Sequence, residues 1–147
     1  MTDLFFITGN NINNKPRDSC KFSPASIQGV IAVSASTKSD EAYSYSNAGV
    51  CVDLFAPGKY ISSASSSCEF CYDTRSGSSM AAPHVSGAIA LLLERCPNLP
   101  PWKVHYHLLS SMTLLDKLDL RPIPRRLRAS TPNLLLHVSN AMCTLDC

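Results

Sequence analysis

The residues with the clearest potential for chemistry lie in one run, Gly77-Ser78-Ser79-Met80-Ala81-Ala82-Pro83-His84-Val85. The run opens an Ala- and Leu-rich segment that continues to Arg95, which predicts a helix with Ser79 at its amino end. The helix dipole and the free backbone N–H groups there would favour an oxyanion that forms beside the Ser79 hydroxyl. A serine at this position can equally be an ordinary helix cap, and the sequence pattern of a helix start leaves both interpretations open.

Acyl transfer by a serine also requires a hydrogen-bond donor aimed at the carbonyl oxygen that becomes negative. Asn10, which follows the apolar run of residues 4–8 and the turn residue Gly9, has a side-chain amide that could donate such a bond. Taken alone, Gly-Asn is only a turn dipeptide. Its place before Ser79 in the chain is what makes it a candidate partner of the nucleophile.

The elements that must position these residues follow from apolar patterning. Helices are expected over residues 79–95, apolar on almost all sides and therefore buried, and over 102–112, with Trp102, Leu108, Leu109 and Met112 available for packing. Residues 59–76 read as an irregular segment or hairpin, and residues 114–130, rich in Arg and Pro, as a surface connection. Strands are expected over residues 4–8, 29–36, 43–46 and 50–55, with a last apolar segment at 132–138.

The composition is that of one globular domain, with 147 residues, 45% of them apolar and 16% charged. A net charge of +2 is too small to indicate a nucleic-acid or membrane partner. Seven cysteines point to an oxidising compartment, extracellular or in the secretory lumen. Residues 1–8 have neither the basic region nor the long apolar run of a signal peptide, a conflict that a truncated amino terminus would resolve.

The run from Gly77 to Val85 resembles the Gly-Thr-Ser-Met-Ala-x-Pro-His-Val motif of the subtilase family, with Ser78 where the family usually has threonine. The resemblance implies that Ser79 is the nucleophile and that His84 is a structural histidine rather than the catalytic base. Ile7-Thr8-Gly9-Asn10 is similar to the family's Ala-Ala-Gly-Asn segment. That similarity implies an oxyanion-hole role for Asn10 and a place in the floor of the specificity pocket for Ile7, Thr8 and Gly9.

Three more segments resemble the proteinase K-like branch of this family. They are Phe22-Ser23-Pro24-Ala25-Ser26, the segment from Cys51 to Gly58 that contains Val-Asp-Leu-Phe-Ala-Pro-Gly, and Thr131-Pro132-Asn133-Leu134-Leu135. The resemblance therefore spans residues 4–138. It implies an α/β fold, subtilisin-like and doubly wound around a mainly parallel sheet, of which this chain represents the C-terminal half. Residues 1–140 would form the partial peptidase domain and residues 141–147 a C-terminal tail.

The same branch often holds calcium, and the resemblance implies a site made by the backbone carbonyls of Gln28 and Val30 and the carboxylate of Asp53. Such a set of hard oxygen ligands suits Ca²⁺. A surface aspartate without a metal is the alternative.

The cysteine pattern resembles that of the subtilisin/kexin proprotein convertases and implies disulfides between Cys20 and Cys51 and between Cys68 and Cys71. Zinc and thioredoxin-like interpretations of Cys-x-x-Cys are weaker, because no second ligand pair follows at the required spacing. The sequence leaves three cysteines unassigned, Cys96, Cys143 and Cys147.

The family's triad also needs an aspartate and a histidine that precede the serine, because a serine is a poor nucleophile without a positioned base. No Asp-Ser/Thr-Gly or His-Gly-Thr motif occurs in the chain. We therefore expect a serine endopeptidase fragment that is inactive alone, with a polypeptide substrate and a missing N-terminal half as its partners. The alternative is a non-catalytic binding or regulatory protein on the same scaffold. A binding patch or processing site within residues 121–128 is a third interpretation, although an Arg-rich loop is usually just solvated.

Overall fold

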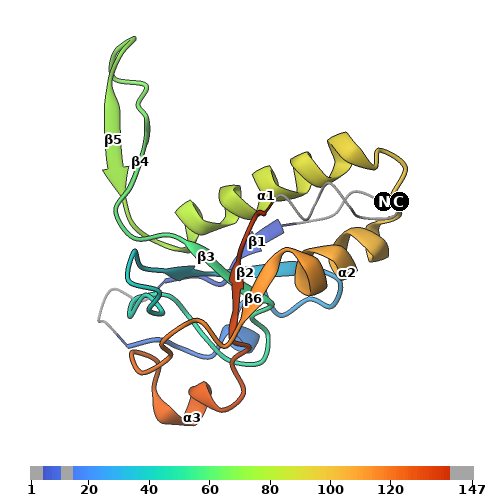
Figure 1. Cartoon of the computed structure of the whole chain (residues 1–147). Helices are drawn as coiled ribbons and strands as arrows, with labels where there is room; N and C mark the ends of the chain where they lie inside the picture. The colour runs from blue at the N-terminus through green and yellow to red at the C-terminus, as the bar shows by residue number, and fades with distance from the viewer. Residues whose placement is uncertain (1–4, 11–14, 140–147) are drawn as a thin grey trace.

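A mainly parallel sheet forms the centre of the computed structural model, which describes residues 5–10 and 15–139 (Figure 1). The strand order is β1-β2-β3-β7-β6. Four neighbouring strands run parallel, and β6 joins β7 in the antiparallel sense at one edge. The expected α/β class with a mainly parallel sheet is confirmed. The strands are β1 (Phe5–Ile7), β2 (Ile31–Ser36), β3 (Leu54–Pro57), β6 (Thr113–Leu115) and β7 (Leu134–Leu136).

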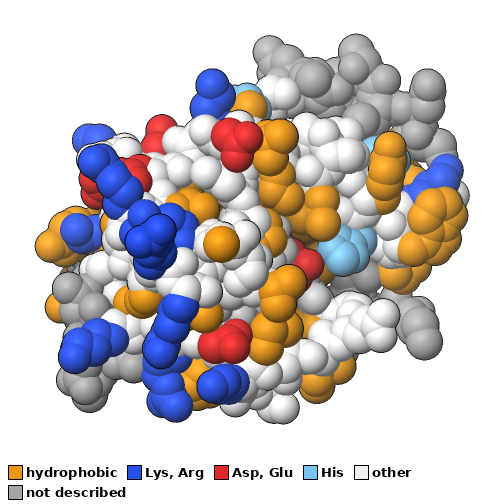
Figure 2. All heavy atoms as spheres, turned by 90° about the horizontal axis from the view of Figure 1, so that it is seen from below, with side chains coloured by type: hydrophobic (Ala, Val, Ile, Leu, Met, Phe, Trp, Pro, Cys, Tyr) orange, Lys and Arg blue, Asp and Glu red, His pale blue; other side chains and the backbone are white. Residues whose placement is uncertain are grey.

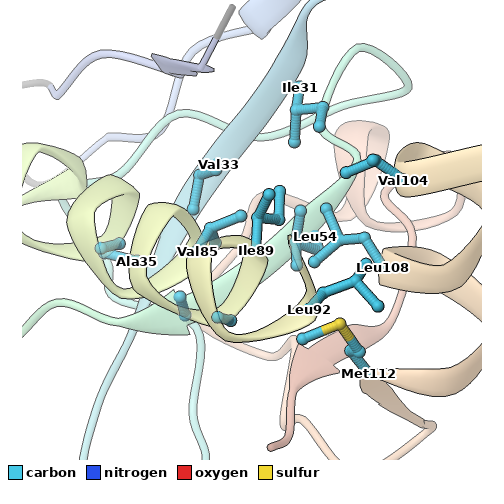
Figure 3. Packing of buried hydrophobic residues seen from close by; sticks show 13 residues of the cluster. Ile31, Val33, Ala35, Leu54, Val85, Ile89, Leu92, Val104, Leu108 and Met112 are labelled. Carbon is cyan, nitrogen blue, oxygen red and sulfur yellow. The ribbon is translucent and has the colours of Figure 1, made fainter. Parts of the chain in front are cut away.

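Two helices cover one face of this sheet, α1 (Ser78–Arg95) and α2 (Pro101–Ser111). Alternate residues of β2 and β3 point toward these helices, as the period of two in a strand requires. Figure 3 shows the resulting core, in which the α1 residue Ile89 lies between the sheet and α2. The buried members are Ile31, Val33, Ala35, Leu54, Ala56, Ala81, Val85, Ala88, Ile89, Leu92, Val104, Leu108 and Met112.

The opposite face of the sheet packs on a smaller apolar cluster. Phe55 points to this face from β3, and Leu118, Ile123 and Leu127 come from the connection between β6 and β7, which contains α3 (Arg125–Arg128). The prediction that residues 114–130 form a surface connection is therefore wrong in part. Arg121, Arg125 and Arg126 are exposed and its two prolines are partly exposed. Its spaced apolar residues Leu118, Ile123 and Leu127 are buried against the sheet.

The helix around Ser79 is buried on one side only, contrary to the expectation from its apolar sequence. Val85 and Leu92 face the sheet and are fully buried, whereas Leu91 on the other side is 51% exposed. Trp102 at the start of α2 is likewise 68% exposed instead of packed. Within the described part of the chain, the sheet and α2 supply apolar partners for only one side of α1.

Two of the expected strands differ from the observed ones. Residues 43–46 form no strand, although Ser46 makes an isolated antiparallel bridge with Asn10. The strand expected over residues 50–55 begins only at Leu54 and continues to Pro57. The delay follows from Gly49, whose positive φ of 112° and hydrogen bond from its N–H to the Thr131 hydroxyl belong to a turn and not to a ladder.

A two-stranded hairpin, β4 (Ile61–Ala64) and β5 (Tyr72–Arg75), projects away from the rest of the chain (Figure 1). The Cys68–Cys71 disulfide closes the connection between its strands. Phe70 and Tyr72 are 86% and 77% exposed. The hairpin interpretation of residues 59–76 is confirmed.

Positive charge gathers on the face seen from below in Figure 2, the side on which α3 lies in Figure 1. Much of this charge already has a structural partner. Arg121 pairs with Asp119 at 2.6 Å, and the Arg128 guanidinium donates to the carbonyls of Ile123 and Arg121. Arg125 and Arg126 are exposed. None of the described helices is long and apolar enough to cross a membrane.

Candidate active site

Ser79 is the second residue of α1, and its side chain is exposed. None of the described residues makes a hydrogen bond to its hydroxyl. Gly77 precedes the helix with φ 148° and ψ 170°, a conformation that is essentially restricted to glycine. The Gly77 N–H donates to the carbonyl of Gly58 at 2.7 Å, so the turn after β3 fixes the start of the helix. A Cβ at Gly58 would lie 2.5 Å from the Ala35 Cβ, so this turn also requires glycine.

Asn10 lies directly against the start of this helix. Its Oδ1 accepts a hydrogen bond from the Ser78 N–H at 3.0 Å. A Cβ built on Gly77 would stand 2.9 Å from Asn10 Nδ2, so the side-chain amide covers the glycine backbone. Because Oδ1 is used and no described residue accepts from Nδ2, the amide retains both N–H groups as donors one residue from Ser79.

The predicted floor of the specificity pocket, Ile7 to Gly9, is the end of β1 and the residues that follow it. Thr8 is fully buried, and its N–H continues the ladder to the Val33 carbonyl at 3.1 Å. Gly9 has a φ of 81°, which turns the chain from β1 toward Asn10. The structure thus brings Thr8, Gly9 and Asn10 to the carboxyl end of β1, beside the amino end of α1.

An open hollow of about 610 Å³ lies between the hairpin and α1. Ser79, Met80, Pro83 and His84 line it from the helix, and Ile61, Asp73 and Arg75 are among the residues that line it from the hairpin. The Nδ1 of His84 bonds to the Met80 carbonyl at 2.8 Å. Because a carbonyl only accepts, Nδ1 is the donor, and the bond holds the ring along its own helix. This geometry fits the structural role expected of His84.

Pro83 is the sixth residue of α1 and lies beyond its first turn. Proline has no N–H, so the Ser79 carbonyl has no helical partner four residues later. Helix α1 nevertheless continues without interruption to Arg95.

Of the residues expected to hold calcium, Val30 and Asp53 both lie near the start of β2. Val30 directly precedes β2, and the Asp53 Oδ2 accepts from the Ala32 N–H at 2.7 Å. Asp53 Oδ1 is 3.7 Å from His105 Nε2, too far for a hydrogen bond. Burial raises the pKa of Asp53, although the Ala32 N–H and His105 act in the opposite direction. Gln28 is exposed in the loop before β2, and the described residues contain no group of three or more His, Cys, Asp or Glu side chains that could hold a metal ion.

The structure contains the two disulfides that the resemblance implies, Cys20–Cys51 and Cys68–Cys71. The first joins the 3-10 helix η1 (Ser19–Lys21) to the turn before β3. Cys96 is also disulfide-bonded. Cys143 and Cys147 lie outside the described residues, as does the tail predicted at 141–147.

Sequence reasoning missed one residue of this region, Asn47. Asn47 falls between the strands expected over residues 43–46 and 50–55, and the structure buries it beside Thr8 and Gly9. An asparagine ahead of Gly49 is an ordinary turn signal, and nothing in the local sequence distinguishes a buried amide from an exposed one.

Comparison with known proteins gives this arrangement a family. The model described as "Subtilase family" matches residues 4–133. The chain is 42% identical over 120 residues to proprotein convertase subtilisin/kexin type 9 of Rattus norvegicus. The matched region covers 79% of this chain and 17% of that protein. It is 41% identical over 124 residues to the extracellular serine proteinase of Thermus sp. (strain Rt41A). The matched region covers 84% of this chain and 28% of that protein.

A solved structure of a cold-adapted subtilisin-like serine proteinase superposes with a TM-score of 0.76 at 38% identity. The superposition covers 91% of this chain and 44% of that one. The chain therefore spans less than half the length of the relatives that it matches. Because the family model covers most of the residues and the sheet has the same architecture, this chain belongs to the subtilase family.

Proposed function

We propose that this chain supplies the nucleophile and an oxyanion donor of a serine endopeptidase that acts on polypeptides. The observation that carries the proposal is the hydrogen bond from the Ser78 N–H to Asn10 Oδ1, which joins residues 68 positions apart. It leaves the Asn10 Nδ2 group free to donate next to Ser79. Family membership makes a serine-type peptidase the expected class of activity.

The mechanism would begin with attack of the Ser79 Oγ on the carbonyl carbon of the scissile peptide bond. A base takes the hydroxyl proton, and the carbonyl oxygen becomes an oxyanion. Asn10 Nδ2 and the Ser79 backbone N–H would stabilise this oxyanion by hydrogen bonds. The proton then passes to the leaving amine, and water releases the acyl group from Ser79 in a second round. His84 does not serve as this base in the proposal, because its ring is bonded to the Met80 carbonyl.

The base and its aspartate would come from an N-terminal half of the domain. The uncovered side of α1 and the edge strand β1 offer surface and backbone groups with which such a half could pack and pair. We propose an extracellular or secretory location for the assembled protein, because disulfides persist in oxidising compartments.

The test combines the full chain with the N-terminal half of the catalytic domain of the Thermus relative. Both polypeptides would be co-expressed in an oxidising compartment and purified as a complex. Hydrolysis of a fluorogenic peptide and labelling of Ser79 by a fluorophosphonate are the two readouts, and Ser79→Ala is the matched control. We expect hydrolysis and labelling of the wild-type chain only. A stable complex in which Ser79 is not labelled would instead support the non-catalytic binding protein.

We also propose that Asp53 and the carbonyls of Gln28 and Val30 bind calcium when the ion is present. The ion would neutralise the partly buried Asp53 carboxylate and stabilise the chain before β2. The measurement is the thermal midpoint of the complex with calcium and with a chelator. Calcium should raise the midpoint of wild type and not of Asp53→Asn, and an equal rise in both would exclude this site.

A further inference from the structure

Asn47 is buried, and its side-chain and backbone nitrogen and oxygen atoms all make hydrogen bonds. Its side chain is 2% exposed. Nδ2 donates to the Thr8 carbonyl at 2.9 Å, and Oδ1 accepts from the Arg17 N–H at 3.1 Å. Its backbone N–H donates to the Gly9 carbonyl at 2.9 Å, and its carbonyl accepts from the Ser34 hydroxyl at 2.8 Å. One residue thus holds two successive carbonyls of the segment that ends at Asn10.

Three buried hydroxyls extend this arrangement beneath the same segment. Ser34 and Ser46 hydroxyls are 2.8 Å apart, and the Ser46 Oγ accepts from the Ala35 N–H at 3.0 Å. The Thr8 hydroxyl approaches Ser46 Oγ at 3.5 Å. Ser46 also forms the antiparallel bridge with Asn10. The four side chains of Thr8, Ser34, Ser46 and Asn47 are each no more than 2% exposed.

A buried polar network of this kind is costly unless its members are satisfied, and once satisfied it fixes a single local geometry. The fixed geometry matters here because Gly9 lies between the network and the oxyanion donor. Its φ of 81° and missing side chain would give the chain freedom at this point. A Cβ at Gly9 would lie 3.0 Å from Asn47 Nδ2, so the Asn47 amide packs directly on the Gly9 backbone.

We infer that Asn47 is a positioning residue for catalysis, which holds the Thr8 and Gly9 carbonyls so that Asn10 presents its amide to the oxyanion. The inference rests on the proposed peptidase function of Ser79 and Asn10. Asn47 is too deeply buried to touch substrate, so it acts through Asn10. A donor displaced by a fraction of its bond length loses much of its value in the transition state, whereas substrate binding elsewhere is unaffected.

The variant Asn47→Leu keeps the number of side-chain heavy atoms and removes the amide. Asn133 provides a matched control, because its side chain also clamps a backbone segment by two bonds, from Nδ2 to the Leu118 carbonyl at 2.9 Å and from the Leu118 N–H to Oδ1 at 3.0 Å. Its partner lies in the connection between β6 and β7 and not in the segment before Asn10. Asn133→Leu therefore measures the cost of losing an amide clamp as such.

The assay measures kcat and KM of the complex described above for wild type, both Leu variants, Asn10→Ala and the double variant Asn10→Ala with Asn47→Leu. We expect Asn47→Leu to lower kcat by about 10-fold or more, up to the roughly 10²- to 10³-fold loss of a deleted donor, with KM nearly unchanged. In the Asn10→Ala background the same change should leave kcat within about twofold, because the residue through which it acts is gone. Equal losses in both backgrounds, or an equal loss in Asn133→Leu, would show a merely structural role and overturn the inference.

A second readout does not depend on activity, so it separates failure of this inference from failure of the proposed function. The Ser78 N–H is bonded to Asn10 Oδ1, and its hydrogen exchange reports whether Asn10 holds its position. Asn47→Leu should accelerate exchange at Ser78 by about 10-fold or more, and Asn133→Leu should not. If Ser78 exchanges equally in wild type and Asn47→Leu, Asn47 does not position Asn10, whether or not the complex hydrolyses peptides.

Discussion

Replacing Gly77 by alanine tests the geometry of the proposed oxyanion site most directly. The new Cβ would lie 2.9 Å from Asn10 Nδ2, well inside contact distance, and 3.5 Å from the Asn10 Cγ and Oδ1 atoms. The nearest atoms belong to the end of an exposed side chain, which can rotate away more easily than the backbone can shift. We therefore expect Gly77→Ala to displace the Asn10 amide and to break its bond with the Ser78 N–H.

Two separate costs follow from this change. The backbone at Gly77, with φ 148° and ψ 170°, lies in a region nearly closed to alanine, so the free energy of unfolding should fall by about 1–3 kcal/mol. Displacement of the donor should lower kcat by up to about 10²- to 10³-fold, equivalent to roughly 2.7–4 kcal/mol of transition-state stabilisation. The second cost is the one that depends on Asn10.

The control is Gly29→Ala, since Gly29 also has a positive φ, 85°, but a Cβ there would meet nothing within 4 Å. Both variants would be assayed in the complex with the N-terminal half, with calcium in excess because Gly29 lies between two proposed ligand residues. Urea unfolding gives the stability of each, and peptide hydrolysis gives kcat and KM.

We expect both variants to lose stability and only Gly77→Ala to lose kcat. If Gly77→Ala and Gly29→Ala have the same kcat, the contact between Gly77 and Asn10 has no part in catalysis. The reasoning would also fail if Gly77→Ala lowered kcat as strongly in an Asn10→Ala background as in wild type.

Other perturbations probe helix α1, the disulfides and the partly buried Asp53 carboxylate. Gly87→Ala should raise the free energy of unfolding by up to about 1 kcal/mol, because Gly87 lies within α1 and a Cβ there would meet open space. Urea unfolding that shows no such rise would contradict this prediction. Cys20→Ser should lower that free energy by about 2–4 kcal/mol, because its disulfide spans a sequence separation of 31. The loss in Cys68→Ser should be smaller by roughly 2 kcal/mol, because its disulfide spans a separation of only 3. Equal losses in calorimetry would count against a loop-entropy origin. Because burial raises the pKa of Asp53, the folded state binds that proton more tightly than the unfolded state, and the contribution of this group to stability falls as pH rises from the ordinary aspartate range through the raised pKa. In calcium-free buffer, the free energy of unfolding of Asp53→Asn should therefore increase relative to that of wild type as pH rises. Urea unfolding at several pH values measures both, and parallel curves of stability against pH would contradict this.

The sequence by itself predicted Ser79 as the candidate nucleophile and determined the local elements around it. The run from Gly77 to Val85 is contiguous, so its helix and the position of Ser79 at the amino end follow from residue order and helix periodicity. The buried β-branched run that became β2 and the hairpin at residues 59–76 were predictable for the same reason. The cysteine pairs that the structure contains followed from a family resemblance and not from any local pattern.

Only the tertiary structure decided how distant residues meet. Asn10 and Ser78 are 68 positions apart, and no periodic pattern specifies a hydrogen bond between a turn and a helix start. Asn47 reads as a turn residue in sequence, yet packing buries it and makes its amide bond to Thr8. The apolar sides of α1 and α2 predicted burial, but Leu91 and Trp102 stay exposed because burial needs a partner surface. Local propensity therefore placed Ser79 at the start of a helix, whereas the proposed oxyanion site around it depends on contacts that exist only in the folded chain.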